Sequence, residues 1–254
     1  MIILLSPAKK LDENVSDIKS YSFPLFFDEA CSLINELKTY SSARLQSLMG
    51  VSQKIADLNV ERYNSFVCDK KFKVGKQALY MFNGDVYNNM VRGGYIKNDL
   101  EFAQEHLLIL SGLYGALRPL DRIQPYRLEM GTSLKYNGAK NLYELWSEKV
   151  SNYIKKEIKK HNSPFILNLA SKEYSKVIDR DTVGVPVIEV QFKQNKNGQY
   201  KSFGLLAKRA RGMMADFAIK NKIDDINGIK KFKTAGYSFQ QSLSLENNLI
   251  FHQD

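Results

Sequence analysis

Short apolar runs alternate along this chain with longer stretches of helical periodicity. Four runs have the length and composition of buried strands: residues 2–5, 107–110, 165–169 and 185–190. Three stretches carry apolar residues at helical spacing, which predicts helices: residues 28–40, 142–160 and 211–220. Residues 200–207 alternate between apolar and polar positions. We expect them to form a strand that pairs with residues 188–194 across the turn at Asn197 and Gly198.

This mixture of elements predicts a mixed α/β (α+β) fold. The strands on either side of the Asn197 turn should be antiparallel, which argues against a regular doubly wound sheet. With 254 residues and 44% apolar composition, the chain is long enough to bury a full core. No Pro-, Gly- or Ser-rich linker and no internal repeat divides it. We therefore expect a single domain over residues 1–254.

Residues 41–66 have the pattern of two short helices joined by a hairpin. Ser41 or Ser42 is a suitable N-cap for the first helix, and Gly50 is suited to end it in a left-handed conformation. Ser52 is then expected to cap a second helix that continues to about Phe66. Its inward face is predicted from three residues: Ile55, Leu58 and Tyr63.

The hairpin at 48–56 is similar to the generic helix-hairpin-helix motif, which grips nucleic-acid phosphates. Free backbone N–H groups at a helix start carry partial positive charge and suit an anion. Candidate contacts here are the hairpin residues and the basic residues beside them: Arg44, Gly50, Val51, Ser52, Lys54 and Arg62. Ser52 stands where the motif usually has a second glycine. An ordinary pair of packed helices is the alternative interpretation.

The charge balance favours a polyanionic partner. Lys and Arg total 37 against 27 Asp and Glu, which gives a net charge of +10 and a pI of about 9.3. Residues 201–233 contain nine basic and three acidic residues, so six of the surplus charges lie in that stretch. A solvated basic surface has the same composition, so charge alone does not identify the polyanion.

Other classes of protein receive little support. No run approaches the roughly 18 apolar residues of a membrane span, and the apolar start is too short for a signal peptide, so we expect a cytoplasmic protein without a membrane partner. Cys31 and Cys68 are far apart in sequence and are expected to be separate buried thiols. The three histidines are scattered, and the sequence predicts no metal site and no cofactor.

Polar residues gather in the loops that follow the predicted strands. Such loops commonly carry binding and catalytic residues. They lie at 6–9, 82–87, 117–121, 124–131 and 168–174.

These loops and the segment 208–214, taken in order, resemble the YaaA family of peroxide stress resistance proteins over residues 3 to about 237. The resemblance implies a cytoplasmic, single-domain fold in which helices wrap a curved mixed sheet. It also implies a helix-hairpin-helix and a basic cleft that bind DNA, and a role in limiting oxidative damage to DNA. Gly50, Val51 and Ser52 match the family's hairpin. Charge and placement suggest seven cleft cations: Lys9, Arg118, Arg127, Lys172, Lys208, Arg209 and Arg211.

Some of these arginines have a structural alternative. Arg118 and Arg127 are candidates for ion pairs with Asp121 and Glu129, and Arg209 and Arg211 are candidates for solvated residues at a helix start.

Three functional hypotheses follow. The leading one is a DNA-binding protein of the peroxide stress response that contacts phosphates with little base readout. The second is an enzyme acting on nucleic acid or a nucleotide by glycosidic or phosphodiester chemistry, with loop carboxylates as the acid, base or nucleophile: Asp85, Asp121, Glu129 and Glu173. The third is an iron-handling protein, for which the sequence offers no clustered ligands. Any small-molecule ligand is left open.

Overall fold

Strand β1 (Ile2–Leu5) is an interior strand of a mixed sheet in the computed structural model, which describes residues 1–14, 19–70, 72 and 74–254. It is completely buried, and it pairs in parallel with β3 (Leu107–Ser111) on one side and β6 (Ile166–Asn168) on the other. All four of its side chains are apolar, as expected of a strand covered on both faces.

The sheet continues beyond β6 through β7 (Val187–Lys196), a long strand shared by two parts of the molecule. Its first residues pair in parallel with β6, and residues 189–194 pair in parallel with β10 (Asn248–Gln253). Three antiparallel strands complete the sheet: β4 (Gly115–Leu117) beside β3, β8 (Gln199–Lys201) beside β7, and β9 (Tyr237–Phe239) beside β10. The predicted mixed α/β fold is confirmed, and the sheet does not close into a barrel.

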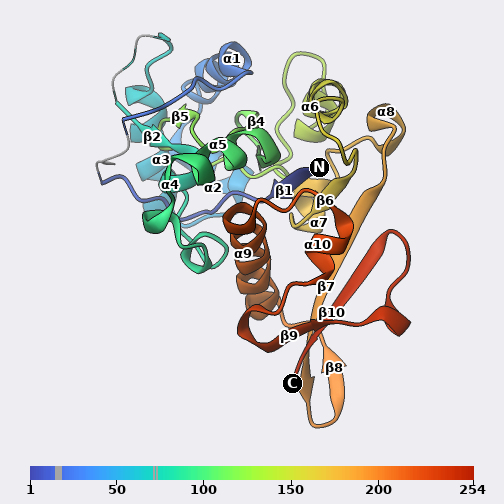
Figure 1. Cartoon of the computed structure of the whole chain (residues 1–254). Helices are drawn as coiled ribbons and strands as arrows, with labels where there is room; N and C mark the ends of the chain where they lie inside the picture. Colours follow the sequence, from blue (N-terminus) through green and yellow to red (C-terminus); the bar gives the residue numbers. More distant parts are fainter. Residues whose placement is uncertain (15–18, 71, 73) are drawn as a thin grey trace.

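Helices surround the sheet within the described residues, and Figure 1 shows α1 to α6 grouped about one end of the molecule while β8, β9 and β10 extend to the other. Their bounds are α1 (Phe27–Leu37), α2 (Ser42–Met49), α3 (Gln53–Ser65), α4 (Ala78–Met81), α5 (Lys97–His106), α6 (Leu142–Ile158), α7 (Lys172–Ser175), α8 (Arg180–Val183), α9 (Gly204–Asn221) and α10 (Ile226–Lys230). Four 3-10 turns and a small second sheet complete the elements: η1 (Tyr87–Asn89), η2 (Arg92–Gly94), η3 (Thr234–Gly236), η4 (Gln241–Leu243), β2 (Lys76–Gln77) and β5 (Arg122–Ile123).

The strand predicted over 200–207 is wrong after Lys201. β8 ends at Lys201, and α9 begins at Gly204, seven residues before the predicted helix. Apolar residues in this stretch fit strand alternation over a few positions, but Ala207, Ala210 and Met214 continue at helical spacing and are buried. The predicted turn is confirmed, since Asn197 and Gly198 have φ values of 55° and 79°.

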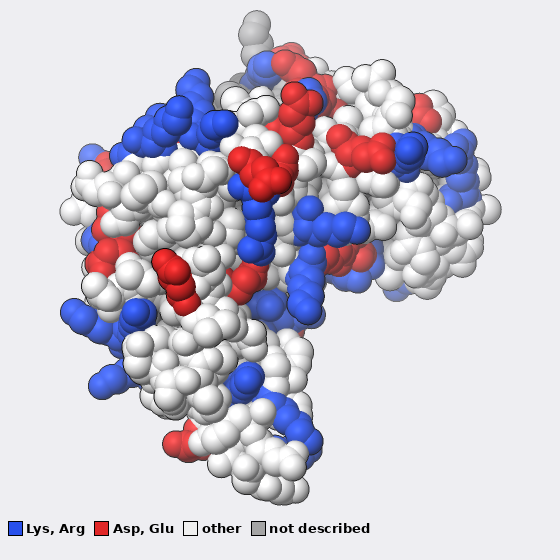
Figure 2. Space-filling model, turned by 90° about the vertical axis from the view of Figure 1, so that its right-hand side faces the viewer, with Lys and Arg blue, Asp and Glu red and all other residues white. Residues whose placement is uncertain are grey.

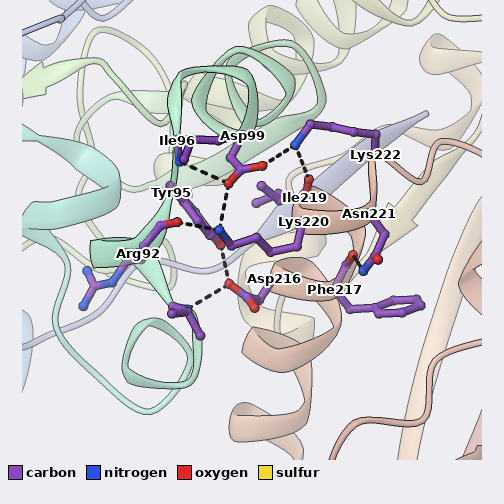
Figure 3. Close-up of polar contacts among 12 residues, drawn as sticks. Arg92, Tyr95, Ile96, Asp99, Asp216, Phe217, Ile219, Lys220, Asn221 and Lys222 are labelled. Atoms are coloured by element: carbon purple, nitrogen blue, oxygen red, sulfur yellow. Dashed lines mark hydrogen bonds and ion pairs between the residues drawn. The ribbon is translucent and has the colours of Figure 1, made fainter.

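A cluster of charged side chains ties the end of α9 to the start of α5 (Figure 3). The Asp99 carboxylate accepts hydrogen bonds from the Lys220 ammonium at 2.8 Å, from the Lys222 ammonium and from the Ile96 backbone N–H at 3.1 Å. These hydrogen bonds, chiefly those from the two lysines, hold the pKa of Asp99 well below its usual range. Next to this cluster, the Asp216 carboxylate accepts from the Tyr95 hydroxyl at 2.6 Å.

We expect Asp99→Ala to lower the free energy of unfolding by about 2 kcal/mol, because two lysines lose their shared carboxylate and keep only backbone carbonyls as acceptors. Urea unfolding at pH 7 measures the change. Glu101→Ala is the matched control, since Glu101 is an exposed carboxylate of the same helix in a loose 3.7 Å pair with Lys97. A loss no greater than that of the control would contradict a stabilising role for the Asp99 cluster.

Candidate functional site

The centre of the sheet is a topological switch point. The chain passes from β1 to β3 on one side and later places β6 on the other side of β1, so the loops after β1 and β6 diverge. Open α/β sheets bind ligands at such a point, outside the carboxyl ends of the strands. Here the two loops meet through serines, because the Ser171 backbone N–H donates to Ser6 Oγ at 2.8 Å. The Tyr87 hydroxyl donates a hydrogen bond to the Ser6 carbonyl oxygen at 2.8 Å and so holds this loop in place.

A cleft of about 430 Å³ opens at this edge. Its walls come from the loop after β1, the loop before η1, the segment 126–129, the loop after β6 and helix α9. The charged residues that line it are five cations and three carboxylates: Lys9, Lys10, Arg127, Lys208, Arg211, Asp85, Glu129 and Glu173. The formal excess of two positive charges makes the cleft suited to an anion.

Two of the cleft cations are held by a carboxylate. Glu129 Oε2 pairs with Lys9 Nζ at 2.9 Å, and its Oε1 accepts from the Arg127 guanidinium at 2.7 Å. The ion pair between Arg127 and Glu129 was the structural alternative for that arginine, and it is present. Glu129 therefore neutralises part of the charge on this wall.

The two cleft cations on α9, Lys208 and Arg211, have no such ion pair with a described carboxylate. Lys208 and Arg211 are three residues apart, so they project from one face of the helix into the cleft. Neither makes an ion pair with any described residue. Burial lowers the pKa of the half-buried Arg211 guanidinium, so an incoming anion would offset a desolvation cost that this arginine already bears. Arg209 points to the next face, where its Nε lies 4.0 Å from Asp85.

Glycines let α9 and the neighbouring loops approach closely. A Cβ atom at Gly212 would overlap the carbonyl oxygen of Val86, so α9 contacts the loop before η1 with no space between them. At Gly131 a Cβ atom would crowd the Glu173 carboxylate, which accepts from the Gly131 N–H at 3.0 Å. These contacts set the width of the cleft.

Two predicted site residues lie elsewhere. Arg118 and Asp121 follow β4, which runs antiparallel to β3 and returns the chain to the opposite edge of the sheet. Arg118 is bound there by the Glu157 carboxylate, at 2.5 Å, and by the Gln104 carbonyl. The carboxylate of its expected partner Asp121 accepts from the Arg118 backbone N–H at 2.7 Å and makes no ion pair with the guanidinium. The structure thus removes Arg118 from the cleft cations and Asp121 from the cleft carboxylates. Lys172 is exposed at the start of α7, next to the cleft residues Ser171 and Glu173.

The segment 41–66 forms the two helices that its sequence predicts. Ser41 Oγ accepts from the Arg44 N–H at 3.2 Å, and Gly50 has a φ of 59°, so the first helix begins and ends as expected. Ser52 precedes α3, but its side chain makes no capping hydrogen bond, contrary to the prediction. Leu58 is 42% exposed, and the inward face is instead made by Ala56, Asn59 and Tyr63.

The basic residues of this helix pair differ in availability. The Arg44 guanidinium stacks on the Tyr40 ring, with its carbon 3.4 Å from the ring centroid, and Arg62 pairs with Glu13 at 2.5 Å. Lys54 is exposed beside Gly50, Val51 and Ser52 at the turn and has no ion-pair partner in the described part of the chain.

Helix α3 also connects the turn to the cleft. The Tyr63 hydroxyl near its far end donates to the Arg127 carbonyl, on the cleft wall. Ten residues of helix separate Tyr63 from the start of α3, a distance of about 15 Å.

Charges on the surface are interspersed. Figure 2 shows Lys and Arg alternating with Asp and Glu on one face, with several basic side chains beside the indentation between the two ends of the molecule. Within residues 1–14, 19–70, 72 and 74–254, no three His, Cys, Asp or Glu side chains lie together in a way that would hold a metal ion. None of the helices in these ranges has the length and apolarity needed to cross a membrane.

Sequence reasoning missed several residues of the cleft. Lys10 was adjacent to a predicted cation, and Tyr87 and Tyr174 lie in loops that were already singled out. The signal for Lys10 was its position one residue after Lys9. The two tyrosines could not be predicted, because a buried tyrosine that lines a cleft and a tyrosine in the core have the same sequence pattern.

Comparison with known proteins supports a family assignment. The model of a family described as "Peroxide stress protein YaaA" matches residues 1–243. A UPF0246 protein of Legionella pneumophila (strain Corby) is 44% identical over 256 residues, covering 99% of this chain and 98% of its own. UPF0246 proteins of Bordetella petrii and Bordetella pertussis are 43% and 42% identical, each covering 100% of this chain and 99% of its own.

Proposed function

The chain belongs to the peroxide stress protein YaaA family, and from this premise we propose that it binds DNA through its phosphates in the response to oxidative stress. In this proposal the turn between α2 and α3 acts as a helix-hairpin-helix and the cleft provides a second basic contact. Phosphate contacts position a protein on DNA without reading its sequence.

The observation that carries the proposal is the open start of α3. Ser52 leaves the first turn uncapped, so the backbone N–H groups of Gln53 and Lys54 meet no acceptor among the described residues. Lys54 adds a free charge at the same place. An uncapped, exposed helix start with a neighbouring lysine suits a phosphate oxygen.

The cleft supports the same function, because its distance from the turn is one that duplex DNA can span. About 15 Å of helix separates the turn from the cleft wall, which corresponds to four or five base pairs at about 3.4 Å each. Lys208 and Arg211 are then the cations for a second phosphate, since they lack carboxylate partners among the described residues. Arg127 and Lys9 contribute less because Glu129 neutralises them.

Binding to duplex DNA over a salt series tests this proposal. Ser52→Asp places a good N-cap with a negative charge at the open helix start, so it should preserve α3 while repelling phosphate. We expect Ser52→Asp, and Arg211→Ala in the cleft, each to flatten the slope of log affinity against log salt by about 1.

Lys155→Ala is the matched control, since it changes the net charge by the same amount. Lys155 is exposed near the end of α6, which leads toward the amino end of β6, at the edge opposite the cleft. It should leave the slope unchanged. Absence of DNA binding by the wild-type protein, or equal slopes in all variants, would refute the proposal.

The position of the cleft at the switch point favours a second candidate function, an enzyme that acts on a nucleotide unit. Glu129 is occupied by two cations, whereas Glu173 Oε2 and the Asp85 carboxylate are less restrained. A carboxylate beside free cations can serve as a general acid or base near a phosphate-bearing substrate.

Incubation with oligonucleotides that carry oxidised or missing bases, followed by separation of the products, tests the second candidate. Product formation by the wild-type protein that is lost in Glu173→Gln and kept in Asp121→Asn would support it, because Asp121 lies outside the cleft. If no oligonucleotide is altered, the enzyme hypothesis fails and DNA binding remains the proposed function.

A further inference from the structure

The fold brings together two cysteines that are distant in sequence. Cys31 lies on α1 and is 8% exposed, whereas Cys68 follows α3 and is exposed, so the expectation that both are buried is wrong for Cys68. The Cys68 thiol lies close enough to Cys31 to raise the pKa of the Cys31 thiol. Both also lie near the Tyr114 hydroxyl, whose pKa is raised by burial and further by charge on either cysteine.

Contacts on both sides of the two cysteines hold this arrangement. The Phe27 and Phe72 rings stack with their centroids 5.5 Å apart, and Lys70 pairs with Asp28 at 3.0 Å. At the other end of α1, the Lys38 ammonium donates to the Phe66 carbonyl at 3.3 Å. The segment around Cys68 is therefore fastened along α1 before and after Cys31. A disulfide would join two side chains that this packing already holds near each other.

We propose that Cys31 and Cys68 form a disulfide when the protein meets hydrogen peroxide. The exposed Cys68 reacts first, because the thiolate of an accessible cysteine is the form that attacks peroxide. Its sulfur takes one peroxide oxygen and becomes a sulfenic acid, while the other oxygen leaves as water. The Cys31 sulfur then attacks the Cys68 sulfur and a second water leaves. Two thiols are oxidised by two electrons and one peroxide is reduced.

The environment of Cys31 suits the second step and not the first. Burial raises its pKa, and the neighbouring Cys68 thiol raises it further, so Cys31 is a protonated thiol at neutral pH. Lys38 favours the Cys31 thiolate, which is the form that attacks the Cys68 sulfenic acid. The chemistry therefore has an order, in which Cys68 is the peroxide-reactive residue and Cys31 the resolving residue.

The covalent link would enclose α2 and α3, since both helices lie between the two cysteines in sequence. Peroxide would thus fasten the ends of the segment that carries the proposed DNA-binding turn. The disulfide itself does not depend on DNA binding, and its test is separate.

The experiment treats the full-length reduced protein with a small excess of hydrogen peroxide and follows free thiols, intact mass and peptide maps. We expect loss of both thiols, a mass lower by two hydrogen atoms, a peptide that joins Cys31 to Cys68, and full reversal by dithiothreitol. A sulfenic-acid trap should label Cys68 in Cys31→Ser. In Cys68→Ser, we expect Cys31 to oxidise at least about tenfold more slowly than the wild-type thiols.

Retention of both thiols, oxidation of Cys68 without linkage to Cys31, or linkage between two chains would each overturn the proposal. A DNA-binding titration before and after oxidation tells the two proposals apart. If the disulfide forms and DNA does not bind under either condition, the cysteine pair stands and the proposed function fails.

Discussion

Gly212→Ala should destabilise the protein by about 3 kcal/mol or more, because the added methyl group would overlap the Val86 carbonyl oxygen. Backbone cannot move aside as a flexible side chain can, so α9 must shift away from the loop before η1. Lys208 and Arg211 shift with it, and the cleft loses its shape. Thermal unfolding should show the midpoint lowered by roughly 6–12 °C.

Gly204→Ala is the control for this substitution. Gly204 is in the same helix, and a Cβ atom there would meet nothing within 4 Å. Alanine favours helix more than glycine does, so the control should be neutral or slightly stabilising. An unchanged midpoint in Gly212→Ala would mean that α9 and the Val86 loop do not approach as described.

The second large effect concerns Asp121, whose carboxyl group is only 3% exposed at the edge away from the cleft. Burial raises its pKa to about 6, although hydrogen bonds from Ser22 and the Arg118 N–H act in the opposite direction. The folded protein therefore holds this proton more tightly than the unfolded chain does. The resulting stability is complete below the unfolded pKa of about 3.9 and is lost as pH rises through about 6.

The stability of Asp121→Asn relative to wild type should therefore rise with pH. From pH 4 to pH 8 the difference should change by about 2 kcal/mol in favour of the variant, whatever the fixed cost of replacing a carboxylate oxygen by an amide group. Urea unfolding at a series of pH values measures it. A difference that is independent of pH would contradict a raised pKa.

Asp57→Asn provides the opposite case. Hydrogen bonds from the Ser42 and Gln53 side chains lower the pKa of the exposed Asp57 carboxyl. Stability from this group is present above its unfolded pKa and lost as pH falls, so the variant should lose stability relative to wild type with rising pH. The effect should be small, because solvent screens an exposed group.

The sequence predicted the central strands well, since a completely buried parallel strand is a continuous apolar run with few alternatives. It placed Arg118 and Asp121 with Arg127 and Glu129 because the two pairs lie in successive loops. The direction of β4 separates them: this short antiparallel strand carries the chain to the opposite edge before residues 126–129 return. Strand direction depends on pairing with β3, which local pattern does not contain.

The cysteine pair is a second example of a long-range arrangement that local sequence pattern does not predict. Their spacing of 37 positions excluded every local motif and suggested two unrelated thiols. Only the packing of the segment after α3 on α1, fixed by Phe27, Phe72 and Lys70, brings them together. Contacts of this kind arise from aromatic residues that look like ordinary core residues in the sequence.

The interior position of β1 also constrains how the chain acquires its structure during synthesis. Its two neighbours in the sheet begin at Leu107 and Ile166, so β1 is synthesised before either of them. At ribosomal speeds of about 5–20 residues per second, the interval before Ile166 emerges is roughly 8–30 s. Throughout that time the apolar residues Ile2, Ile3, Leu4 and Leu5 have no permanent partner. The nascent chain should therefore be a client of ribosome-associated chaperones, and its yield should depend on them more than its final stability would suggest.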